Sequence, residues 1–71
     1  MSYYDEMQKA KTRVRTTLLP LLNRGEKITL EEVFYDLDKT NIKYSEKGIE
    51  KYITRMCNLE GFSFDGEIIS Q

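Results

Sequence analysis

Hydrophobic residues recur every three or four positions in the first 24 residues, which is the spacing of one face of an α-helix. This predicted buried stripe consists of Met7, Ala10, Val14, Leu18 and Leu21. The segment "SYYD" at residues 2–5 has the form of a capping box, so we expect the helix to begin near residue 3. Pro20 lacks the amide hydrogen that a helix interior uses. Pro20 therefore predicts that the first helix either ends before it, over residues 3–19, or is kinked there and continues over residues 3–24. Gly25 would be the residue beyond the end of the longer helix.

A second helix is predicted over residues 30–40. Its stripe consists of Leu30, Val33, Phe34 and Leu37. Thr29 and Glu32 have the T-x-x-E spacing of a capping box, which places the start of this helix. Tyr35 points away from the stripe, and residues 27–28 are a candidate for a very short strand before the helix.

A third helix is predicted over residues 46–60. Its buried face consists of Ile49, Tyr52, Ile53 and Met56. Ser45 is its expected N-terminal cap, and Gly61 is the residue beyond its end. A glycine inside a helix costs about 1 kcal/mol relative to alanine. Gly48 therefore indicates a close approach of another helix or backbone, and we favour close helix packing. The alternative is that the first turn of the helix simply tolerates a glycine.

The C-terminal segment "FSFDGEIIS" predicts a β-hairpin over residues 62–70. The Asp65-Gly66 pair favours a two-residue type I′ turn. That register pairs Phe64 with Glu67 and Phe62 with Ile69. An isolated hairpin is unstable in water, so its apolar face must pack on the helices. The predicted fold class is mainly α with a small β-hairpin.

The composition removes several classes of function from consideration. The chain has 71 residues, a single cysteine, Cys57, and no histidine, so neither an internal disulfide nor a zinc site can form. No apolar run approaches the roughly 20 residues that span a bilayer. Ser45 is better explained as a helix cap than as a nucleophile. We expect a cytoplasmic protein that is not an enzyme, with no catalytic residues, no cofactor and no metal.

Charge is segregated along the chain although the net charge is only −1. Residues 1–24 carry five cations against two carboxylates, and residues 39–55 again carry five against two. Residues 25–38 carry five carboxylates against one cation, and residues 56–71 carry three carboxylates and no cation. Local fields rather than net charge decide where a polyanion can approach. Chance segregation is the alternative explanation.

The order of helix, short strand, helix, turn, helix and hairpin resembles the winged helix-turn-helix family. The segment "LEEVFYDLDKTNIKYSEKGIEKYITRMCNLEGFSFDGEII", residues 30–69, is similar to that family's second helix, turn, recognition helix and wing. Ile42 falls where such motifs place an apolar residue in the turn. The resemblance implies a single winged-helix domain over residues 1–71, whose third helix enters the DNA major groove through its solvent face.

The solvent face of the third helix is basic and polar on a helical wheel. Lys47, Lys51 and Arg55 lie four residues apart on one ridge. The expected DNA-binding residues are Lys43, Tyr44, Lys47, Glu50, Lys51, Thr54 and Arg55. Lys9, Arg13 and Arg15 in the first helix are candidates for contacts with the DNA backbone, and simple solvent exposure is equally consistent with them. A solvated helix face is also the ordinary explanation of a lysine-rich ridge.

Two functions follow from these observations. The first is a small protein that binds double-stranded DNA, a transcriptional regulator acting as a homodimer, because twofold assembly doubles the contacts of a small module. Its wing carries Asp65 and Glu67 and is expected not to contact DNA. The second is a winged-helix protein-interaction module that presents the acidic second helix, Tyr35 and the acidic wing to a basic protein partner.

Overall fold

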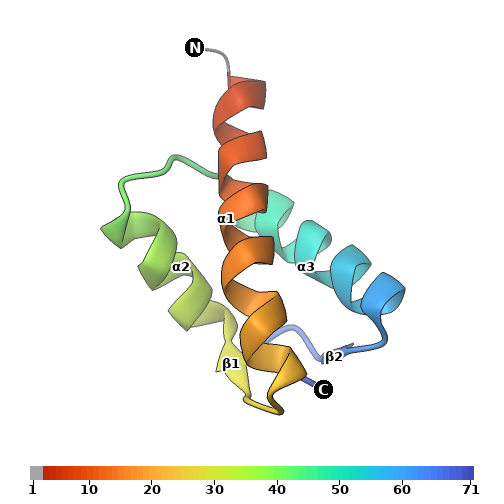
Figure 1. The fold of residues 1–71 in the computed structure, drawn as a ribbon. Helices are drawn as coiled ribbons and strands as arrows, with labels where there is room; N and C mark the ends of the chain where they lie inside the picture. Colours follow the sequence, from red (N-terminus) through yellow and green to blue (C-terminus); the bar gives the residue numbers. More distant parts are fainter. Residues whose placement is uncertain (1–2) are drawn as a thin grey trace.

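The computed structural model describes the backbone of residues 3–71 and the side chains from residue 5 onward. Three helices alternate with three short strands along the chain (Figure 1). The elements are α1 (Tyr3–Asn23), β1 (Ile28–Thr29), α2 (Leu30–Lys39), α3 (Glu46–Glu60), β2 (Ser63–Phe64) and β3 (Ile68–Ser70). The mainly helical fold with a small sheet is as predicted. The expected cap at Ser2 lies outside the described residues.

Helix α1 runs through Pro20 and ends at Asn23, which matches the longer predicted range. Pro20 is exposed, so the hydrogen bond it removes is lost on the solvent side. The predicted stripe is wrong at its end: Leu22 is buried and Leu21 is only half-buried. Leu22 lies a full turn beyond Leu18, and this spacing keeps it on the core side. Gly25 ends the segment with a φ of 83°, and its N–H donates to the Leu22 carbonyl at 2.9 Å.

Helix α2 begins at its predicted cap. The Thr29 hydroxyl oxygen accepts from the N–H of Glu32 at 3.2 Å. The strand before it spans residues 28–29 instead of the predicted 27–28, because Ile28 and Thr29 are the residues that pair with Ile69 and Ile68 of β3. Beyond its end, Asn41 has a φ of 58° and the N–H of Ile42 donates to the Leu37 carbonyl at 3.1 Å. This arrangement closes α2 as a Schellman motif does.

Helix α3 begins and ends at its predicted residues. The Ser45 hydroxyl oxygen accepts from the N–H of Gly48, and Gly61 adopts a φ of 79°. The predicted buried face needs one correction, because Cys57 is buried while Tyr52 is half-buried. A Cβ on Gly48 would lie 2.8 Å from Met7 Cε in α1, so the glycine marks a close approach of the two helices, as favoured from the sequence.

The three strands form one antiparallel sheet with the order β1-β3-β2. The predicted hairpin register is wrong. Phe64 pairs with Ile69 and Ser63 pairs with Ser70, a shift of two residues. Within this turn only Gly66 has a positive φ, 98°, whereas a type I′ turn needs two such residues. A shift of two preserves which face each side chain occupies, so Phe64 and Ile69 still face the helices as predicted.

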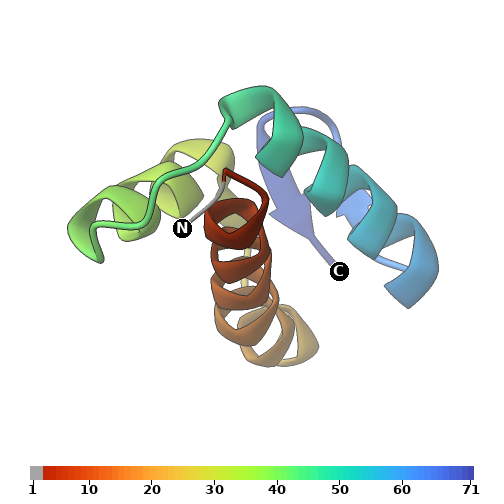
Figure 2. The same ribbon diagram turned by 90° about the horizontal axis from the view of Figure 1, so that it is seen from above.

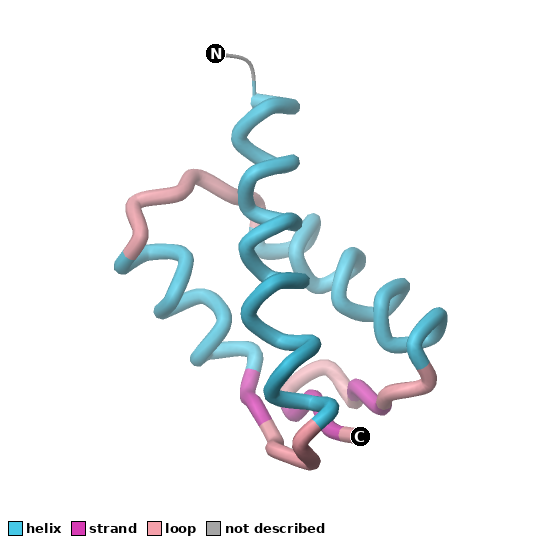
Figure 3. The backbone as a smooth tube through the Cα atoms, viewed as in Figure 1, coloured by secondary structure: helices cyan, strands magenta, loops and turns pink. Residues whose placement is uncertain are grey.

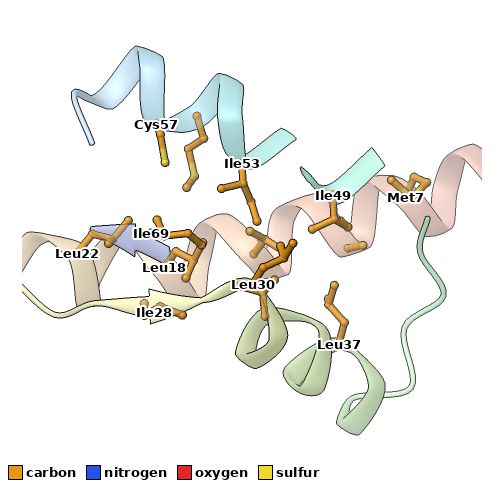
Figure 4. Packing of buried hydrophobic residues seen from close by; sticks show 14 residues of the cluster. Met7, Leu18, Leu22, Ile28, Leu30, Leu37, Ile49, Ile53, Cys57 and Ile69 are labelled. Carbon is orange, nitrogen blue, oxygen red and sulfur yellow. The ribbon is translucent and has the colours of Figure 1, made fainter. Parts of the chain in front are cut away.

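The core lies between α1 and the other elements. Helices α2 and α3 diverge on either side of α1, and the strands lie near its C-terminal end (Figures 2 and 3). All fourteen buried side chains among the described residues are hydrophobic, and Figure 4 shows them meeting from the three helices and from β1 and β3. Ile69 is fully buried at the centre of the sheet and pairs with Ile28 in β1 and Phe64 in β2. The third strand therefore ties the hairpin to the start of α2.

Two leucines in helices give a direct test of this core. Leu37 in α2 is fully buried, whereas Leu59 in α3 is 80% exposed. We expect Leu37→Ala to lower the free energy of unfolding by about 2–5 kcal/mol, because it removes buried methyl groups and leaves a cavity. Leu59→Ala should change it by less than about 0.5 kcal/mol. Urea unfolding followed by circular dichroism measures both, and equal effects would contradict the described packing.

Candidate nucleic-acid interface

The basic ridge, defined as Lys47, Lys51 and Arg55, lies on the exposed side of α3. Ile49 and Ile53 are fully buried on the opposite side and fix the rotation of the helix. The observed buried face includes Cys57, where the prediction had Tyr52. The direction opposite to this face therefore falls close to Lys51, the middle of the ridge. The three cations of the ridge therefore project away from the core along two turns of one helix.

Four cations of α1 and of the loop that follows it form ion pairs within the chain. Four ion pairs join them to carboxylates: Lys9 to Glu6 at 3.8 Å, Arg13 to Asp36 at 2.8 Å, Arg15 to Glu60 at 3.8 Å and Arg24 to Glu26 at 2.8 Å. Across the part of the chain that the structure describes, no ion pair includes a member of the basic ridge. The ridge thus keeps its charge available to an external anion.

The Arg13–Asp36 pair is the best formed of these interactions. The Arg13 guanidinium donates from Nε to one Asp36 oxygen at 2.8 Å and from Nη2 to the other at 2.9 Å. This two-pronged geometry joins α1 to α2. The hydrogen bonds from Arg13 hold the pKa of the Asp36 carboxyl below its ordinary value. Arg13, a candidate for DNA-backbone contact in the sequence, therefore has both prongs directed at the chain's own α2.

Arg15 and Lys9, the other two candidates in α1, are less tightly held. Arg15 extends toward Glu60 at the end of α3, and the pair is about half exposed on the arginine side. Lys9 lies one helical turn from Glu6. Contacts of this kind between exposed side chains contribute little and are screened by salt. None of the three α1 candidates, however, lies beside the basic ridge in the groove described below.

Tyr44 has a structural position in the turn between α2 and α3. Its ring stacks on Phe34 with centroids 5.4 Å apart, and its hydroxyl donates to Asp38 at 3.0 Å. Burial, followed by the hydrogen bond to Asp38, raises the pKa of Tyr44 to about 12. Because Phe34 and Asp38 both belong to α2, these two contacts of Tyr44 hold the turn against α2.

The remaining expected contact residues are exposed. Lys43 lies in the turn, and Glu50 and Thr54 flank the ridge on α3. The Thr54 hydroxyl donates to the Glu50 carbonyl at 2.9 Å, so only its oxygen lone pairs are left for a ligand. Glu50 places a carboxylate beside Lys47 and Lys51, where it repels phosphate and can accept a hydrogen bond from a base.

A groove between α1 and α3 brings together cations that the sequence did not group. Its lining residues are Met7, Gln8, Lys11, Gly48, Lys51, Tyr52 and Arg55. Lys11 lies over the Tyr52 ring, with Nζ 5.9 Å from the ring centroid. Lys11 follows Met7 by four residues, so its place at the edge of the α1 stripe was visible in the helical spacing. That spacing could not show which part of α3 would lie opposite.

The hairpin presents the opposite charge. Asp65 and Glu67 are exposed at its turn. The Asp65 carboxylate accepts from the N–H of Ile68 at 2.8 Å and of Glu67 at 2.9 Å, and these bonds hold its pKa below the ordinary value. The turn therefore stays anionic at neutral pH, which disfavours phosphate nearby.

Other kinds of site have little support between residues 3 and 71. No group of three or more His, Cys, Asp or Glu side chains lies together as a metal site in that range. None of the helices described combines the length and the apolar character needed to cross a membrane. Cys57 is buried, and this burial raises the pKa of its thiol, which disfavours the reactive thiolate.

Comparisons with protein-family models, with curated proteins and with solved structures found no match. Function therefore has to be argued from the charges and contacts of this chain alone.

The lowered pKa of Asp36 predicts a pH dependence of stability. A carboxyl whose pKa is lower in the folded state stabilises the fold above its ordinary pKa, 3.8, and loses that contribution as the pH falls through the folded-state value. Asp36→Asn should therefore be less stable than the original chain near neutral pH. The difference should shrink as the pH is lowered below the ordinary value. Urea midpoints measured for both chains from neutral pH to about pH 2 test this. A difference that does not vary with pH would exclude the ion pair as its cause.

Proposed function

We propose that this protein is a small double-stranded DNA-binding protein, a transcriptional regulator that enters the major groove with α3. One observation carries the proposal: the basic ridge is exposed and outside the ion pairs of the described chain, while Arg13, Arg15 and Arg24 face carboxylates of the same chain. Unpaired cations at fixed spacing on a rigid helix suit the phosphates and guanine edges of a duplex.

The arrangement of elements supports a winged helix-turn-helix assignment. The order α1, β1, α2, α3, β2, β3 is the element order for which the sequence resembles that family. The turn between α2 and α3 is held against α2 by the hydrogen bond from the Ile42 N–H to the Leu37 carbonyl and by the stacking of Tyr44 on Phe34. A helix that follows a turn held in this way can present side chains to a groove without a large loss of conformational entropy on binding.

We assign the DNA contact to α3 and not to the hairpin. The anionic turn at Asp65 and Glu67 would meet repulsion from phosphates, whereas the ridge would be attracted by them. The hairpin instead closes the core, because Ile69 is fully buried between its two neighbouring strands.

A protein-interaction module is the second candidate, because Tyr35 on α2 is 69% exposed. The acidic segment around it is largely engaged within the chain, which weakens this candidate. Glu26 pairs with Arg24, Asp36 with Arg13, Asp38 accepts from Tyr44, and Glu32 accepts from Thr29. Most carboxylates of the acidic segment thus have partners within the chain, whereas the cations of the basic ridge form no ion pair among the described residues.

We further propose that the protein acts as a homodimer. The chain measures 35 × 22 × 18 Å, so one copy covers only about one turn of duplex. Two copies related by a twofold axis would place two α3 helices in successive major grooves, which requires a separation of about 34 Å. Analytical ultracentrifugation with and without duplex would give the stoichiometry.

The proposal predicts a defined loss on removal of the ridge. The triple variant Lys47→Ala, Lys51→Ala, Arg55→Ala should bind duplex DNA far more weakly than the original chain. If each cation neutralises one phosphate, the slope of log affinity against log salt should become shallower by about 2.7. Fluorescence anisotropy with a labelled random duplex, over a series of salt concentrations, measures both quantities.

A matched control removes the same charge elsewhere. Arg24→Ala, Lys27→Ala and Lys39→Ala together delete three exposed cations that lie outside the ridge. This control should keep most of the affinity and the slope. If the two triple variants lost the same affinity, net charge alone would explain the loss, and the assignment of the contact to α3 would be contradicted. Absence of binding by the original chain at low salt would overturn the proposal and favour the protein-interaction module.

A further inference from the structure

We propose that the α1–α3 groove holds the phosphate backbone of one DNA strand, and that Lys11 is the α1 residue that binds it. This inference rests on the proposed function and deepens it, because it adds a second helix to the interface. It also replaces the three α1 residues expected from the sequence, Lys9, Arg13 and Arg15, by one that was not among them.

The lining of the groove favours an anion. Lys11 comes from α1, Lys51 and Arg55 come from α3, and no carboxylate is among the lining residues. Two other concave surfaces differ in this respect. The one between α1 and α2 includes Glu32 and Asp36, and the one at the α2–α3 turn includes Asp38 and Glu46. A phosphate in the α1–α3 groove would meet cations from two sides.

A fourth concave surface, along the outer side of α1, is the nearest rival. Its lining includes Lys9 and Arg13 without any carboxylate. Arg13, however, already donates both prongs of its guanidinium to Asp36, and Lys9 lies 3.8 Å from Glu6. Binding a phosphate there would compete with existing ion pairs. Lys11 has no ion pair among the described contacts, and its neighbour is an aromatic ring.

Tyr52 gives Lys11 a defined position. The Lys11 ammonium lies 5.9 Å from the centroid of the Tyr52 ring, and both side chains are half-buried. A cation held over a ring face loses less conformational freedom when it binds than a fully mobile lysine does. The ring has no charge of its own, so the positive charge of Lys11 remains available to phosphate. Tyr52 is therefore a positioning residue and Lys11 a binding residue.

The groove is continuous with the basic ridge, because Lys51 and Arg55 belong to both. A strand whose bases face the outer side of α3 would run with its phosphates along the groove beside it. Gln8, also in the lining, supplies a neutral amide donor. Contacts with phosphate fix the register of a protein on a duplex without reading sequence. Lys11 should therefore contribute equally to binding of every duplex.

The variant Lys11→Met tests this inference. It removes the ammonium and keeps a long apolar side chain over Tyr52, so the packing of the groove is retained. We expect weaker binding to several duplexes of unrelated sequence by the same factor, and a salt slope shallower by about 0.9, the value for one phosphate. Lys11→Arg, which keeps the charge, should retain the original slope. Lys27→Met is the matched control on an exposed lysine outside the groove and should leave the slope unchanged.

The outcomes separate the two proposals. If Lys11→Met and Lys27→Met both bind as the original chain does, while the ridge triple variant loses binding, the groove is not a phosphate site and the proposed function stands. If the ridge triple variant also binds normally, or the original chain binds no duplex, the proposed function fails and this inference fails with it. Thermal unfolding of Lys11→Met, expected to match the original chain, confirms that any loss comes from the missing charge.

Discussion

The buried face of α1 is the constraint on which the rest of this structure depends. A chain of 71 residues buries only about 60% of the surface that its unfolded form exposes, and α1 supplies five of the fourteen buried side chains among the described residues, more than any other element. Helices α2 and α3 both pack against it, with Leu18 and Leu22 near the sheet and Met7 near the start of α3. Because α1 contacts both neighbours, its flanking cations fall within reach of their carboxylates. Arg13 reaches α2, and Arg15 reaches the end of α3.

This packing sorts the charges into two groups. The acidic segment at residues 25–38 lies against cations and hydroxyls of its own chain, so its external field is weakened. The basic ridge lies on the exposed side of α3, where Lys51 and Arg55 also line the groove beside α1, and the fold brings no carboxylate into ion-pair distance of it within the described residues. The net charge of −1 conceals this separation, since charges paired in the fold and charges left exposed count equally in the sum.

The sequence correctly predicted the helix ends that local interactions determine. The starts of α2 and α3 follow from the caps Thr29 and Ser45, and the end of α3 follows from Gly61, because each acts within one turn of its own helix. Contacts between side chains of different elements could not be predicted from the sequence in the same way. The ion pair of Arg13 with Asp36 spans 23 residues, and the cation–π contact of Lys11 with Tyr52 joins two helices. Both depend on how α1 is set against its neighbours, which the spacing of apolar residues in one helix does not specify.

The hairpin register shows how a tertiary contact overrides a local turn preference. Strand β3 is bonded on both sides, and Ile69 is fully buried between Ile28 and Phe64. The carbonyl of Glu67 also accepts from the first N–H of α2 at 2.7 Å, so the position of β3 is fixed by elements outside the hairpin. The Asp65-Gly66 turn must then adapt to it, and the Asp65 carboxylate folds back onto its own backbone. An anionic turn held in this way would be repelled by phosphate, which is why the proposed DNA contact is assigned to α3 and to the groove that α3 forms with α1.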